Sequence, residues 1–110
     1  MKPFAYTRAE TVADAVAALA ASPQAQFLAG GTNLVDLMKY DVAHPDAIVD
    51  INSLPLKEIE ALADGGLRIG ALASNSAVAY DARIEARFPL LASAILAGAS
   101  PQLRNAATTG

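Results

Sequence analysis

Two adjacent glycines followed by two polar residues form the clearest chemical signal in this sequence. Gly30 and Gly31 follow a short apolar segment, and Thr32 and Asn33 precede a helical pattern. Glycines permit backbone conformations closed to other residues and leave no Cβ in the path of a ligand. Free N–H groups at the start of a helix favour a phosphate or pyrophosphate. The segment therefore predicts a loop that can bind an anion.

A plain turn between a strand and a helix is the alternative interpretation of these residues. The segment lacks the Gly-x-Gly-x-x-Gly spacing, and no Lys follows the glycines as in a Walker A loop. Thr32 and Asn33 can add side-chain hydrogen bonds to a ligand, or Asn33 with Asp36 can cap the helix. On spacing alone, the structural turn is the simpler interpretation.

The remaining polar residues give weaker signals. His44 is the only histidine and precedes Pro45, which is typical of a surface turn. The acidic residues are dispersed, with no close pair suited to general acid and base catalysis. Arg104 and Asn105 are interpreted either as a phosphate contact or as a buried structural pair, and spacing favours the second. We expect neither catalytic residues nor metal ligands.

The elements that position these residues alternate between helical and strand-like patterns. Thr11 is predicted to be the N-cap residue of a helix, with Asp14 as its capping-box partner. The first half of the chain is predicted to contain a helix over residues 12–21, a short buried strand over 26–29, a short helix over 34–40 and a strand over 47–51.

The second half contains the clearest hairpin signal, because Asp64-Gly65-Gly66 separates two apolar runs. Ser74 or Ser76 is predicted to cap helical sequence. A stronger helix is predicted from Pro89 to Ala97, with Gly98 as its stop and Pro101 beyond it. No element is predicted for residues 106–110. The pattern as a whole indicates an α+β (mixed α/β) fold with short strands and flanking helices.

The composition of the chain argues against several classes of protein. The chain has 110 residues, no Cys and a net charge of −3, which argues against nucleic-acid binding, disulfide scaffolds and thiolate metal sites. No apolar run is long enough to span a bilayer, and the N-terminus lacks a signal peptide pattern. The 26 Ala residues and only six aromatic residues predict a thin core, which fits either a marginally stable lone domain or a segment that depends on a larger structure.

Two separated motifs resemble one known family. The segment Phe27-Leu28-Ala29-Gly30-Gly31-Thr32-Asn33-Leu34 is similar to the first flavin loop of the FAD-binding medium subunits of molybdenum hydroxylases. That family includes xanthine dehydrogenase and aldehyde oxidoreductase. The segment Gln102-Leu103-Arg104-Asn105, followed by Thr108-Thr109-Gly110, is similar to the sequence that leads into its second flavin loop. The resemblance covers essentially the whole chain.

This resemblance implies the N-terminal portion of a PCMH-type FAD-binding domain over residues 1–110, as a fragment of a longer subunit. In the family, backbone amides of the first loop surround the FAD pyrophosphate. The cofactor-binding residues that the resemblance implies are Gln26, Phe27, Leu28, Ala29, Gly30, Gly31, Thr32, Asn33, Leu34, Thr108 and Gly110.

The resemblance also implies an oxidoreductase component that transfers electrons from iron–sulfur clusters through FAD to an acceptor. Its expected partners are an iron–sulfur small subunit with 2Fe–2S clusters and a large subunit that carries molybdopterin, with no nucleic acid or membrane. We expect a cytoplasmic protein, or a periplasmic one co-exported with a partner that bears the signal. The alternative function is a non-catalytic, Ala-rich interaction module with a structural Gly-Gly turn.

Overall fold

The chain divides into two units, each with its own helices and strands. The computed structural model describes all residues from Met1 to Gly110, with Met1–Leu54 in the first unit and Pro55–Gly110 in the second. The mixture of helices and strands confirms the predicted fold class. None of the helices is both long enough and apolar enough to cross a membrane.

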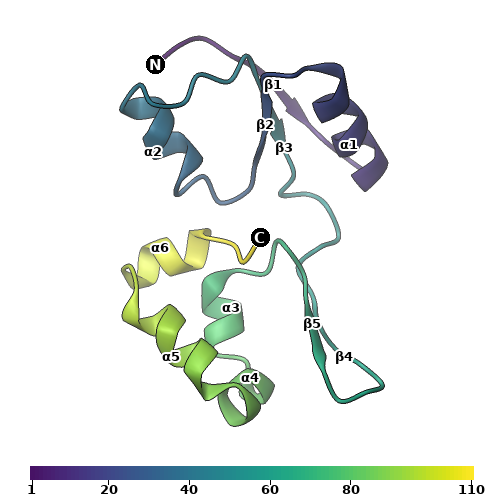
Figure 1. Ribbon diagram of the computed structural model, residues 1–110, viewed down its shortest axis with the longest axis vertical. Coiled ribbons are helices and arrows are strands. Elements are labelled where there is room, and N and C mark those ends of the chain that lie inside the picture. Colours follow the sequence, from purple (N-terminus) through teal and green to yellow (C-terminus); the bar gives the residue numbers. More distant parts are fainter. The chain divides into compact units, whose positions relative to one another are not determined.

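The first unit is built on three parallel strands in the order β1-β3-β2. Two helices connect them, and Figure 1 shows one helix on either side of the strands. The elements are β1 (Ala5–Arg8), α1 (Val12–Ala21), β2 (Ala25–Leu28), α2 (Leu34–Lys39) and β3 (Ala47–Asp50). Ile48 and Val49 of the central strand are each 2% exposed. Since neighbouring residues of a strand point to opposite faces, both faces of β3 are covered.

Local signals account for the bounds of α1. The Thr11 hydroxyl accepts a 3.0 Å hydrogen bond from the backbone N–H of Asp14, which satisfies one of the free donors at the helix start. The helix ends before Ser22, whose backbone is extended. The predicted helix over residues 12–21 is therefore confirmed. The short helix predicted from residue 34 is also confirmed, as α2.

The strand predicted over residues 26–29 is present as β2, but the prediction that this strand is buried was wrong. β2 is an edge strand, and the Phe27 side chain is 39% exposed. The reason is the strand order, because β3 takes the central position although it comes last in the sequence. β1, which is not among the predicted strands, forms the other edge and pairs Tyr6 with Ile48 in register.

The second unit joins a hairpin to four short helices (Figure 1). Strands β4 (Ile59–Ala61) and β5 (Leu67–Ile69) pair antiparallel, which confirms the predicted hairpin. The turn residue Gly65 has a φ of +90°, a conformation that favours glycine. The helices are α3 (Asn75–Ala79), α4 (Ala82–Arg87), α5 (Pro89–Ala97) and α6 (Pro101–Ala106). Their core contains Ala73, Val78, Ile84 and Ala92.

The end of the chain carries structure that the sequence does not predict. Pro101 is the first residue of α6 rather than a residue that only follows α5, and the Ser100 hydroxyl caps this helix by accepting from the N–H of Leu103. Thr108 then forms an antiparallel bridge with Ser74. Figure 1 shows this last segment passing beside the start of α3.

Candidate functional site

The loop between β2 and α2 depends on the backbone conformation of Gly31. Its φ is +75°, in the left-handed region where side chains are strained. A Cβ at this position would lie 3.1 Å from Cγ2 of Val35 and 3.4 Å from Cδ1 of Leu28. The positive φ therefore favours glycine at residue 31, and a Cβ there would also require the Val35 side chain to shift slightly.

The same loop presents backbone donors that the protein does not use. The N–H groups of Gly30, Gly31, Thr32 and Asn33 donate to no acceptor within the chain. By contrast, the Gly31 carbonyl accepts from the N–H of Val35 at 3.1 Å. Gly30, Gly31 and Thr32 are only partly exposed. Because backbone donors removed from water need a partner, this row of N–H groups suits an anionic ligand.

The predicted cap at the start of α2 is absent. Asn33 occupies the N-cap position, but its side chain makes no capping hydrogen bond. Its φ of −106° and ψ of −55° are helical, whereas a capping residue needs an extended backbone to turn its side chain onto the helix. The exposed Asn33 side chain is therefore available to a ligand.

The predicted cofactor residues of the first unit form one continuous stretch. Gln26 and Phe27 lie on β2 with exposed side chains. Of the residues that follow, Asn33 is exposed and the others up to the start of α2 are partly buried, namely Leu28, Ala29, Gly30, Gly31, Thr32 and Leu34. The backbone of this stretch is the part suited to contact a ligand.

Sequence reasoning missed Asn52, which anchors this loop. The Asn52 Nδ2 group donates 2.8 Å hydrogen bonds to the carbonyl oxygen of Ala29 and to Oδ1 of Asp50. The only available signal was that polar residues follow β3 at its carboxyl end, the edge where parallel sheets place ligand sites. This signal becomes useful only when β3 is known to pair with β2.

Asp50 is a carboxylate with several donors around it. Its oxygens accept from the Tyr6 hydroxyl and from both the backbone and the side chain of Asn52. Burial raises the pKa of the Asp50 carboxyl, but these hydrogen bonds and the charge of Arg8 outweigh burial, so this pKa lies below its ordinary value. The hydrogen bond to Asp50 raises the pKa of the Tyr6 phenol above its ordinary value. Asp50 is therefore ionised at neutral pH.

The predicted residues of the second unit lie in the segment that pairs with residues 71–74. The backbone N–H of Gly110 donates to the carbonyl of Ala71 at 2.9 Å. A Cβ on Gly110 would lie 2.7 Å from the Cβ of Ala71, so the close approach of the two segments requires glycine. The Thr108 hydroxyl has only a 3.4 Å hydrogen bond, to the carbonyl of Gly110. It is thus weakly held within the protein.

For Arg104, the structure supports the structural alternative. Its guanidinium Nη1 donates to the carbonyls of Gly98 and Ala99 at 3.1 and 2.8 Å, and the residue is 9% exposed. Asn105 accepts a 2.6 Å hydrogen bond from the Ser76 hydroxyl. Both residues therefore have protein partners.

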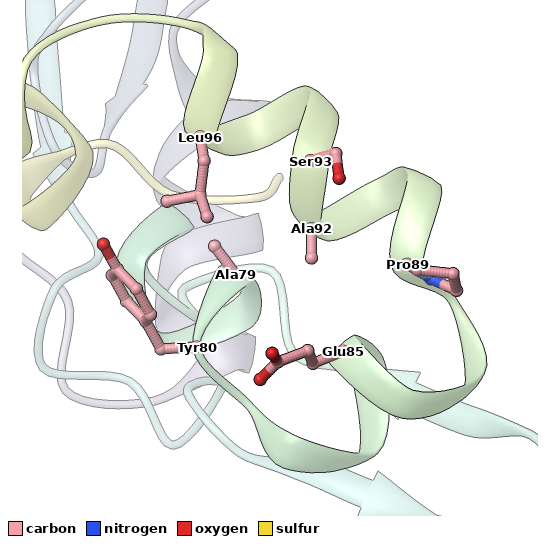
Figure 2. Close-up of a pocket in the computed structure, with 7 residues that line it drawn as sticks. All are labelled: Ala79, Tyr80, Glu85, Pro89, Ala92, Ser93 and Leu96. Carbon is pink, nitrogen blue, oxygen red and sulfur yellow. The ribbon is translucent and has the colours of Figure 1, made fainter.

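The structure gathers the predicted residues into two groups, one in each unit. The first contains residues 26–34, and the second contains Thr108 and Gly110. Neither group overlaps the cavity of about 400 Å³ in the second unit that Figure 2 shows. That cavity is lined by residues of α3, α4 and α5 and by the residue that follows α3, namely Ala79, Tyr80, Glu85, Pro89, Ala92, Ser93 and Leu96.

Comparison with known proteins identifies close relatives of this chain. It is 49% identical over 109 residues to the aldehyde oxidoreductase FAD-binding subunit PaoB of Escherichia coli K12, covering 99% of this chain and 34% of that protein. It is 40% identical over 106 residues to a xanthine dehydrogenase FAD-binding subunit of Escherichia coli O157:H7, covering 96% of this chain and 36% of that protein. The chain thus spans about a third of the length of these relatives.

The fold is shared with solved structures of related enzymes. In the carbon monoxide dehydrogenase of Hydrogenophaga pseudoflava that lacks the Mo-pyranopterin moiety, the matching chain superimposes with a TM-score of 0.90 at 36% identity. The match covers 98% of this chain and 38% of that one. Residues 2–110 match the family model described as the FAD binding domain in molybdopterin dehydrogenase. The chain therefore belongs to the family of FAD-binding domains of molybdopterin dehydrogenases.

Proposed function

We propose that this chain is the part of a molybdenum hydroxylase flavoprotein subunit that holds the pyrophosphate of FAD in the loop between β2 and α2. The observation that carries the proposal is the row of four unpaired backbone N–H groups from Gly30 to Asn33. They are neutral donors in a partly buried loop that contains no Lys or Arg, so a diphosphate would be bound by hydrogen bonds rather than by side-chain cations.

Each predicted residue has a role in this proposal. Gly31 gives the loop its left-handed turn, and Thr32 and Asn33 offer side-chain donors beside the backbone amides. Gln26, Phe27, Leu28, Ala29 and Leu34 complete the stretch that contacts the cofactor. For Thr108 and Gly110, in the second unit, the proposed cofactor role rests on the family resemblance alone.

The redox chemistry of the proposed function is supplied by FAD, which accepts and delivers electrons when it is bound. The task of the chain is to bind and orient the cofactor. The proposed partners are an iron–sulfur small subunit and a molybdopterin-binding large subunit. The names of the relatives support this, since they describe FAD-binding subunits and medium chains of dehydrogenases. The compartment, cytoplasm or periplasm by co-export, belongs to the same proposal and is tested by fractionation.

The family match does not favour the alternative of a non-catalytic interaction module. The two functions differ in one simple property, because only a flavoprotein binds FAD. A protein that lacks flavin absorbance after purification and does not bind added FAD would support the interaction module.

The loop assignment is tested with Gly31→Ala in the intact protein, followed by measurement of bound FAD per polypeptide. We expect FAD affinity to fall about tenfold or more, because the left-handed backbone is strained by a side chain and the row of donors is displaced. Gly65→Ala is the matched control, since Gly65 has a φ of +90° in the hairpin turn of the second unit. Full flavin content in Gly31→Ala would contradict the assignment.

A further inference from the structure

The side chain of Asn52 lies between two acceptors that fix its orientation. Its Nδ2 group donates to the Ala29 carbonyl and to the Asp50 carboxylate, each at 2.8 Å. Only the NH₂ end of an amide can satisfy both partners, because the oxygen end would face two acceptors. The amide of Asn52 is therefore held in one orientation, with its donors toward the loop.

This hydrogen bond also fixes a donor on the other side of the same peptide group. The carbonyl of Ala29 and the N–H of Gly30 belong to one trans, planar peptide unit, so they point in opposite directions. Holding the Ala29 carbonyl toward Asn52 turns the Gly30 N–H away from Asn52. Rotation of this peptide would remove a donor from the row and present a carbonyl oxygen to the anion.

The strands explain why Asn52 reaches this peptide. Leu28 and Asp50 are partners in the parallel register of β2 and β3, and the N–H of Ile51 donates to the Leu28 carbonyl at 3.0 Å. The chain beyond β3 therefore runs beside the first residues of the loop. Asp50 in turn accepts from the Tyr6 hydroxyl on β1, so all three strands contribute to the support of Asn52.

We propose that Asn52 is a positioning residue that directs the Gly30 N–H toward the phosphate of the cofactor, with Asp50 and Tyr6 holding Asn52 in place. This inference rests on the proposed function, because it assumes that the loop binds the FAD pyrophosphate. A residue that merely stabilised the fold would alter unfolding without changing the environment of the bound phosphates.

The test compares Asn52→Asp with the wild type in the intact protein. This substitution keeps the size of the side chain but removes both donors and places a second carboxylate beside Asp50. We expect the Kd for FAD to rise about ten- to a hundredfold. We also expect the phosphorus NMR resonances of the bound pyrophosphate to shift. The matched control is Asn105→Asp, because Asn105 lies in the second unit and its oxygen only accepts a hydrogen bond.

A second variant keeps the inference testable if Asn52→Asp fails to fold. Tyr6→Phe removes one donor to Asp50 without touching the loop, and we expect it to weaken FAD binding by a few fold with the same direction of phosphorus shift. Unchanged phosphorus resonances and an FAD Kd within twofold of wild type, in whichever of these variants folds, would overturn the inference while leaving the proposed function intact. A wild-type protein that binds no FAD would overturn both.

Discussion

The guanidinium Nη1 of Arg104 lies 2.8 Å from the carbonyl oxygen of Ala99. It also donates to the carbonyl of Gly98 at 3.1 Å and to that of Leu96, in the last turn of α5, at 3.5 Å. One buried cation therefore serves acceptors in and just after the last turn of α5. Carbonyls at the C-terminal end of a helix lack intrahelical partners and carry partial negative charge. Arg104 on α6 therefore joins its own helix to the end of α5.

Replacement of this arginine is expected to destabilise the protein. Arg104→Met keeps much of the apolar stem but leaves the Gly98 and Ala99 carbonyls without their donor. We expect a loss of about 2–3 kcal/mol in the free energy of unfolding, measured by chemical denaturation. Arg68→Met is the control, because Arg68 is exposed and has only a 3.9 Å ion pair with Glu60. Equal effects of the two substitutions would contradict the role given to Arg104.

Ala99 itself is strained, and a glycine there should relieve the strain. Its φ is +58°, in the left-handed region that a Cβ disfavours by about 1–2 kcal/mol. We expect Ala99→Gly to raise the free energy of unfolding by up to about 1 kcal/mol, since the greater entropy of unfolded glycine offsets part of the gain. Ala97→Gly at the end of α5 should instead lower it. Destabilisation by Ala99→Gly would show that the strain is small.

Asp81 is the N-cap residue of α4, and its carboxylate predicts that the stability of the protein depends on pH in the acid range. Hydrogen bonds from the Arg83 side chain lower the pKa of Asp81 to about 2, despite the opposing effect of burial, and the N–H groups of Arg83 and Ile84 add to the lowering. Because the folded pKa lies below the ordinary value of 3.8, this stabilisation is complete above about pH 4 and is lost as the pH falls toward 2.

The measurement for Asp81 is the Tm of wild type and Asp81→Asn as a function of pH. Asparagine still caps a helix, so the substitution removes mainly the charge. The difference in Tm should be constant near neutral pH and should shrink as the pH falls from about 4 toward 2. A difference that does not change over this range would contradict the assignment.

The hydrogen bond between Tyr6 and Asp50 predicts an effect at high pH. Ionisation of the Tyr6 phenol would place a second negative charge beside the Asp50 carboxylate, and its pKa is raised above 10.0. The stabilisation is therefore present below the ordinary pKa and is lost as the pH rises through the folded value. The phenolate absorbance that disappears in Tyr6→Phe identifies this titration. We expect Asp50→Asn to lower its midpoint toward 10.0, and an unchanged midpoint would contradict the coupling.

Elements with local signals could be predicted from the sequence. The helix α1 follows Thr11 as predicted, because capping involves residues three positions apart. The hairpin of β4 and β5 was predictable for the same reason, since Gly65 supplies the turn conformation. The adjacent Gly30 and Gly31 also stood out in the sequence, and the structure gives Gly31 a positive φ that favours glycine.

Features set by distant pairings could not be predicted. The exposure of Phe27 follows from the position of β2 at a sheet edge, which depends on the later strand β3. The contact of Asn52 with Ala29 spans 23 residues and arises from the same pairing. Pro101 was ambiguous, because proline both follows helices and begins them. After α5, the residue with a left-handed backbone is Ala99 rather than its neighbour Gly98. The residue types alone do not indicate this choice.

Thr108 and Gly110 differ in how firmly the protein holds them, so substitutions at the two residues should have different effects. The Thr108 hydroxyl has only a 3.4 Å partner within the chain, so Thr108→Val should leave the Tm nearly unchanged. If this hydroxyl contacts the cofactor, the same variant should bind FAD several-fold more weakly, by about 1 kcal/mol. Fluorescence titration of the intact protein with FAD measures this difference.

Gly110→Ala should behave differently, because its Cβ would lie 2.7 Å from that of Ala71. The clash must separate the final segment from residues 71–74, so both the Tm and FAD affinity should fall. Thr109→Val is the matched comparison for Thr108, since the Thr109 hydroxyl donates to the Ala73 carbonyl at 3.0 Å and its loss should lower the Tm. A Thr108→Val protein with wild-type FAD affinity would remove Thr108 from the site and leave the loop between β2 and α2 as the tested contact.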